Sequence, residues 1–63
     1  MDASIESMEP KFRVVWTDPK TGMQYEKEYV RYGTAEHCKI HAERTYPGAK
    51  VKITDMAGIN VEV

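Results

Sequence analysis

The sequence has few of the features that hold a short chain together or mark a catalytic site. Its 63 residues include one cysteine, so no disulfide can form within the chain. It contains no four-ligand zinc spacing and no glycine-rich phosphate loop. A chain of this length buries only about 60% of the surface that its unfolded form exposes. An elaborate internal active site therefore has no room, and we expect neither an enzyme nor a bound cofactor.

Long apolar segments are also missing. The longest uninterrupted apolar run is 14–16, far below the roughly 20 residues that span a bilayer. Asp2 and Glu6 stand where a secretory signal would carry basic residues, and no apolar segment follows them. A lone thiol without a disulfide framework favours a reducing compartment. These features predict a cytoplasmic protein with no membrane partner.

Charge divides the chain into two parts. Residues 1–10 carry Asp2, Glu6 and Glu9 with no Lys or Arg, and they end in proline, so we expect a flexible acidic arm there. Residues 11–63 form the single predicted domain, with nine basic and seven acidic residues. That balance of +2 is far below the strongly basic charge typical of a dedicated nucleic-acid binder.

Residues 11–32 have the pattern of a β-hairpin. Apolar and polar residues alternate along 11–17, and Asp18-Pro19-Lys20-Thr21-Gly22 has the composition of a tight turn. Pairing Asp18 with Met23 gives the predicted facing pairs Trp16–Tyr25, Phe12–Tyr29, Val14–Lys27, Arg13–Glu28 and Val15–Glu26. The aromatic residues then share one face of the sheet. Lys27 does not fit that face, so either it extends to the rim or the register is wrong.

Residues 34–46 have the pattern of a helix that packs on this sheet. Thr34 is the predicted N-cap, Glu36 falls in the first turn, and Pro47-Gly48 ends the helix. The predicted buried stripe, taken at 100° per residue, consists of Ala35, Cys38, Ala42 and Tyr46.

Residues 49–63 have the pattern of a second hairpin around the turn at 55–58. Pairing Asp55 with Ile59 places Ile53 opposite Val61 and Val51 opposite Val63. The whole chain is then predicted to form an α+β fold of order ββαββ, in which one helix covers one face of a small antiparallel sheet. The predicted strand order is 2-1-3-4, with a short last strand at the edge.

The predicted binding surface is either an edge strand of the sheet or the outer helix face. The helix face carries His37, Ile40, His41 and Arg44, an apolar residue with a polar rim, as small recognition patches have. Two alternatives remain open. Single exposed apolar residues are common on proteins, and Ile5 or Met8 of the arm could fold back onto Ile40.

The same helix supports two further hypotheses, a metal site and a catalytic pair, which are weaker than the binding surface. His37, Cys38 and His41 could supply half of a zinc site, but a complete site needs a further ligand from elsewhere in the chain and none is evident, so we expect no metal unless a homodimer shares one. Cys38 with His41 is the only nucleophile–base pair close in sequence, and no orienting group can be assigned to it.

Nucleic acid is the alternative partner, through the predicted sheet cations. These candidates are Arg13, Arg31, Lys50 and Lys52. Glu26, Glu28 and Glu62 are expected on the same face and would weaken phosphate binding. A third alternative is a small structural homodimer formed through the last strand.

The element order also resembles that of a known family. A hairpin precedes a helix that opens Thr34-Ala35-Glu36 and closes Tyr46-Pro47-Gly48-Ala49 before a further strand. This layout is similar to the small inhibitors of host RNA polymerase encoded by T7-like bacteriophages, over about two-thirds of the chain. The extra strand predicted at 59–63 and the lack of a strongly acidic face depart from that family. The resemblance implies only a class, that of tiny, non-enzymatic proteins that dock on a larger machine. We therefore expect a protein-binding module, phage- or prophage-encoded, that docks on a larger host protein and modulates it, as a monomer or weak homodimer.

Overall fold

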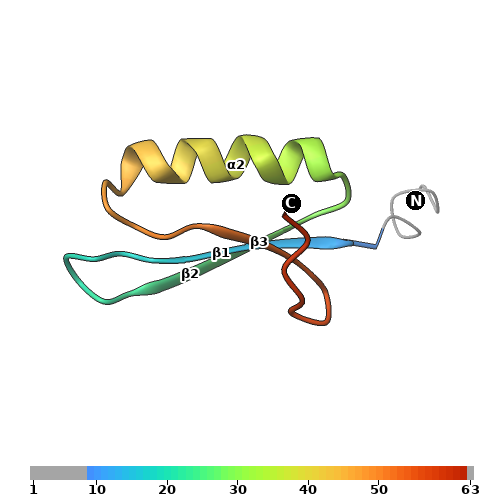
Figure 1. Ribbon diagram of the computed structural model, residues 1–63, viewed down its shortest axis with the longest axis horizontal. Helices are drawn as coiled ribbons and strands as arrows, with labels where there is room; N and C mark the ends of the chain where they lie inside the picture. The colour runs from blue at the N-terminus through green and yellow to red at the C-terminus, as the bar shows by residue number, and fades with distance from the viewer. Residues whose placement is uncertain (1–8, 63) are drawn as a thin grey trace, which may run out of the picture.

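Three strands form an antiparallel sheet, and one helix covers one of its faces (Figure 1). The computed structural model describes residues 9–62, so residues 1–8 of the predicted arm, with Ile5 and Met8, lie outside the described residues. The elements in chain order are β1 (Phe12–Thr17), β2 (Gln24–Tyr29), α2 (Tyr32–Thr45) and β3 (Lys52–Asp55). The sheet order is β2-β1-β3. The predicted α+β class is therefore confirmed. Within the described residues, no helix has both the length and the apolar character needed to cross a membrane.

The β1–β2 hairpin has the predicted register. Trp16 faces Tyr25, Phe12 faces Tyr29, Val14 faces Lys27, Arg13 faces Glu28 and Val15 faces Glu26. The turn is held by Asp18, whose N–H donates to the Met23 carbonyl at 2.8 Å and whose Oδ1 accepts the Lys20 N–H at 2.8 Å. Gly22 completes the turn with a φ of +77°, in the left-handed region that favours glycine. Alternation and turn chemistry agreed on one register, and this is the register that forms.

Lys27 is explained by the position of its strand. It lies on the helix-covered face, opposite Val14, which is fully buried. Because β2 is an edge strand, the Lys27 side chain is exposed even though its partner is in the core. The register was right, and the lysine extends at the rim of the sheet.

The helix begins two residues earlier than predicted. α2 starts at Tyr32, its N-cap is Arg31, and no side chain caps it. Thr34 is therefore inside the first turn, and the first turn contains no acidic residue, so the predictions for Thr34 and Glu36 were wrong. The Tyr32 ring packs edge-on against Phe12, with ring centroids 5.5 Å apart. Tertiary packing of this aromatic pair thus prevailed over the local capping preference.

The fourth predicted strand is not confirmed. After β3, Asp55 N–H donates to the Ile59 carbonyl at 2.9 Å and Val61 N–H to the Ile53 carbonyl at 3.1 Å, which is the predicted alignment. These bonds produce only an isolated β-bridge, between Thr54 and Asn60, and not a fourth strand. The ladder stops because the Ile53 N–H donates to the carboxylate of Glu62 at 3.0 Å instead of to a backbone carbonyl. Val63, the predicted partner of Val51, lies outside the described residues.

The core lies between the sheet and α2. Its buried members are Val14, Trp16, Ala35, Ala42, Val51 and Ile53. Ala35 and Ala42 let the helix approach the sheet closely, while Cys38 and Tyr46 of the same stripe pack against the core and are half-buried. This packing fixes which side of α2 points away from the sheet.

Candidate functional site

The outer side of α2 presents one large apolar residue among polar ones. Ile40 is 46% exposed. His37, His41 and Arg44, which are three or four residues from Ile40 along the helix, are exposed as well. We call these four residues the helix patch. Since buried Ala35 and Ala42 define the inward side of α2, the patch lies on the side that points away from the sheet.

One end of the helix patch reaches the edge of the sheet. His41 lines a hollow of about 300 Å³ together with Lys27 of β2, and the hollow is also lined by Tyr25, Cys38, Thr45 and Tyr46. Thr45 Oγ1 donates to the His41 carbonyl at 2.9 Å, which ties the last turn of α2 to this residue. The helix patch and the β2 edge are therefore neighbouring parts of one surface.

Cys38 lies beside Tyr29 of β2. The neighbouring thiol, together with partial burial, raises the pKa of Tyr29 to about 12. Across residues 9–62, no group of three or more His, Cys, Asp or Glu side chains could hold a metal ion. No hydrogen bond joins Cys38 to His41, although both line the same hollow. In the described part of the chain, the cysteine packs as a small apolar side chain.

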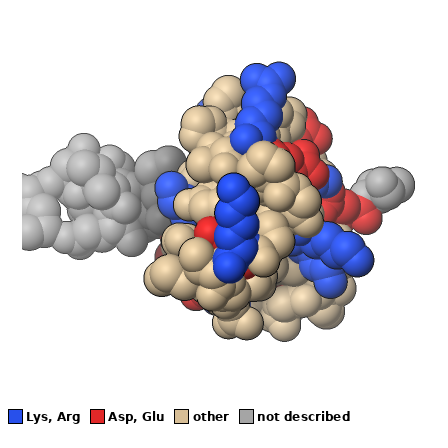
Figure 2. All heavy atoms as spheres, turned by 90° about the vertical axis from the view of Figure 1, so that its left-hand side faces the viewer, with Lys and Arg blue, Asp and Glu red and all other residues tan. Residues whose placement is uncertain are grey.

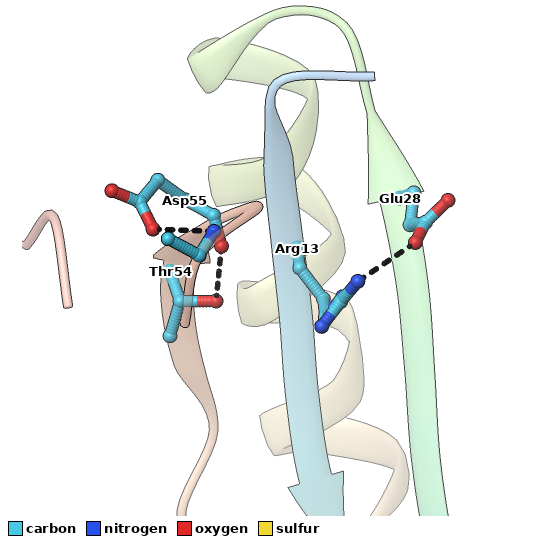
Figure 3. A network of polar contacts seen from close by, with 5 residues as sticks. Arg13, Glu28, Thr54 and Asp55 are labelled. Atoms are coloured by element: carbon cyan, nitrogen blue, oxygen red, sulfur yellow. Dashed lines mark hydrogen bonds and ion pairs between the residues drawn. The ribbon is translucent and has the colours of Figure 1, made fainter. Parts of the chain in front are cut away.

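The cations considered for nucleic acid do not share one surface. Arg13 binds Glu28 across the hairpin at 3.2 Å (Figure 3). On the neighbouring strand, the Thr54 hydroxyl donates a hydrogen bond to the Asp55 carbonyl. Arg31 lies at the start of α2, away from the pair Lys50 and Lys52 that flanks the start of β3. Figure 2 views the end of the molecule with the β1–β2 turn, and its Lys and Arg side chains stand apart with uncharged and acidic surface between them.

Lys50 and Lys52 line a second, wider hollow that sequence reasoning missed. It has a volume of about 770 Å³ and lies between the end of the β1–β2 hairpin and the segment that leads into β3, with Trp16 and Pro19 in its wall. The hollow exists because β3 begins only at Lys52, so the chain before it diverges from β1. Glu26 lines the same hollow, so its charges are mixed.

Sequence reasoning also placed Glu62 on the wrong side of the sheet. Its carboxylate binds the Lys39 ammonium of α2 and not the cations of the open face. This ion pair lowers the pKa of Glu62, burial opposes that change, and the bond from the Ile53 N–H adds to it. The same pair raises the pKa of Lys39. No local pattern in the sequence signals this contact, because the two residues are brought together only by the fold.

Comparison with known proteins gives no relative from which function could be transferred. No family model, no curated protein and no solved structure matches this chain. The fold and its surface are therefore the basis for a functional conclusion.

Proposed function

We propose that this chain is a small non-enzymatic module that docks on a larger intracellular protein through the helix patch and modulates it. The observation that carries the proposal is the exposure of Ile40, which is 46% accessible on a helix packed against the sheet and lies among exposed histidines and Arg44. A β-branched apolar residue loses side-chain freedom in a helix, and at this position nearly half of its surface remains exposed in the free protein. A partner surface that covers it would supply that burial.

The arrangement of the cations favours protein binding over nucleic-acid binding. A phosphate backbone is bound by several unpaired cations along one surface. Here Arg13 is already paired with Glu28, and Arg31 lies apart from Lys50 and Lys52. A phage origin is in keeping with the layout resemblance to polymerase inhibitors and remains part of this proposal.

The test compares two substitutions of exposed apolar residues. Wild-type protein, Ile40→Asp and Ile59→Asp are used to capture a partner from cells of the native host. The captured protein is then purified and titrated with each of the three. Ile59 is 65% exposed on the turn after β3, which makes it the matched control. We expect Ile40→Asp to bind at least about tenfold more weakly, since a central apolar contact is worth more than about 1.4 kcal/mol.

Two results would contradict the proposal. One is an unchanged affinity of Ile40→Asp for the purified partner, which would remove the helix patch from the interface. The other is a large loss of thermal stability, which would show that Ile40 belongs to the core. In a separate titration with single-stranded and duplex DNA at low ionic strength, a protein-binding module should show no salt-sensitive binding.

A further inference from the structure

The two edges of the sheet differ. The outer edge of β3 is covered by the chain itself, through the bonds from Val61 N–H to Ile53 and from Ile53 N–H to the Glu62 carboxylate. β2 has β1 as its single neighbour in the sheet. Nothing else among residues 9–62 hydrogen bonds to the backbone of its outer edge. One edge is closed and the other is open over six residues.

Strand geometry identifies the groups that the open edge presents. In an antiparallel pair, every second residue bonds to the neighbouring strand and the ones between point away from it. The bond from Asp18 N–H to the Met23 carbonyl sets this alternation, so Tyr25, Lys27 and Tyr29 bond inward to β1. The N–H and C=O groups of Gln24, Glu26 and Glu28 therefore point outward. They form a ladder that an extended chain could complete.

The side chains along this edge indicate which residues an added strand should contain. On the open face lie two carboxylates, Glu28, which is paired with Arg13, and Glu26, which forms no ion pair within the described part of the chain. On the helix-covered face lies the hollow of about 300 Å³ beside Tyr25 and Lys27. A strand added here would place alternate side chains against the carboxylates and against this hollow, whose wall includes Trp16, Tyr25 and Tyr46.

We propose that the outer edge of β2 binds an extended segment of the partner in which basic and apolar residues alternate. The basic side chains face Glu26 and Glu28, and the apolar ones enter the hollow between β2 and α2. This inference rests on the proposed function and names the chemistry of the partner. Because His41 lines the same hollow, the segment on β2 and the contact on the helix patch form one continuous interface.

A second copy of the chain is a poor occupant of this edge. Antiparallel pairing of two β2 strands centred on Glu26 places that carboxylate opposite itself. Pairing centred on Lys27 places Lys27 opposite itself and Glu26 opposite Glu28. Like charges directly opposite each other destabilise a strand pair, so the edge charges disfavour self-association and favour a basic segment.

The test uses defined peptides and the full chain. The probes are two short synthetic peptides of equal length, one alternating lysine with valine and the other alternating glutamate with valine. The variants are Glu26→Lys, Glu26→Pro and the control Glu36→Lys, which makes the same charge change on an exposed residue of α2. Glu26→Pro removes one outward N–H without removing a bond to β1.

We expect the lysine peptide to bind wild type and Glu36→Lys alike, and the glutamate peptide to bind at least about tenfold more weakly. Glu26→Lys should reduce or reverse that preference, and Glu26→Pro should abolish binding of the lysine peptide while the melting temperature shows that the domain is folded. Equal binding of the two peptides to wild type would overturn the inference. So would an unchanged affinity in Glu26→Lys, or dimerisation of the free chain through β2.

Binding of the captured partner to the variants distinguishes a failure of this inference from a failure of the proposed function. Loss of partner binding in Ile40→Asp with full binding in Glu26→Lys would overturn the β2 site and leave the helix patch standing. Loss in Glu26→Lys with full binding in Ile40→Asp would support the β2 site and remove the patch.

Discussion

The Lys39 ammonium on α2 binds the carboxylate of Glu62, which lies after the last strand. The other carboxylate oxygen of Glu62 accepts the Ile53 N–H at 3.0 Å. One side chain thus connects the helix, the outer edge of β3 and the end of the described chain. Both partners are only about one-quarter exposed, at 26% and 21%, so solvent screens this pair less than a fully exposed one.

Replacing this carboxylate should destabilise the fold. Glu62→Gln keeps the shape of the side chain but removes the charge, and we expect the free energy of unfolding to fall by about 1 kcal/mol. Lys39→Met should cost a similar amount, and the double variant should cost less than the sum of the two, because the residues interact directly. Urea unfolding of the four proteins measures this. Strictly additive costs would contradict a direct pair.

The same pair gives the fold a defined dependence on acid. Since the folded-state pKa of Glu62 is lowered, its contribution is present above the ordinary carboxyl pKa and is lost as the pH falls through the folded value. Wild type should therefore lose more stability than Glu62→Gln between neutral and acidic pH. Parallel curves for the two proteins would show that the pair does not contribute.

The core should respond to the loss of a single methylene group. Ile53 is fully buried, so Ile53→Val should lower the free energy of unfolding by about 1 kcal/mol. Ile59→Val makes the same change at a residue that is 65% exposed and should cost less than about 0.5 kcal/mol. Thermal or denaturant unfolding checks both values, and equal effects would mean that the core is not centred on Ile53.

Two glycines should respond in opposite directions to alanine. Gly22 has a φ of +77° in the hairpin turn, so Gly22→Ala should destabilise the fold by roughly 1 kcal/mol or more. Gly33 lies in the first turn of α2, where an added Cβ meets nothing within 4 Å, so Gly33→Ala should stabilise it by about 0.5 kcal/mol. Changes of the same sign in the two variants would be incompatible with these backbone conformations.

The contact between Cys38 and Tyr29 should be visible in an alkaline titration. Because the pKa of Tyr29 is raised to about 12, its contribution to stability is present below the ordinary tyrosine pKa of 10.0 and is lost as the pH rises toward 12. The tyrosinate absorbance of wild type minus that of Tyr29→Phe isolates this group. Cys38→Ala should shift its titration to lower pH, and an unshifted titration would contradict the contact.

The sequence predicted the first hairpin fully because two independent signals agreed there. The alternation over Phe12–Thr17 and the turn from Asp18 to Gly22 specify the same register. The start of the helix was missed because the packing of Tyr32 on Phe12, a tertiary contact, outweighs the preference of Thr34 for a cap. The last strand was predicted and is not confirmed for a similar reason, since the Glu62 carboxylate accepts the Ile53 N–H that a strand would have used.

The candidate site was predictable in its residues but not in its surroundings. Helical periodicity alone separates Ile40 from the buried side of α2 that holds Ala35 and Ala42. It gives no information on what lies beside the helix. The hollow that joins His41 to Lys27 depends on the angle between α2 and the sheet, which only the packed structure supplies.

The most direct test of the central claim is NMR chemical-shift mapping of the backbone amides as the purified partner is added. The account predicts that the largest shifts occur in the helix patch around Ile40 and His41 and along the outer edge of β2 at Glu26, while the turn around Ile59 changes little. Shifts confined to that turn, or to the segment with Lys50 before β3, would contradict the account.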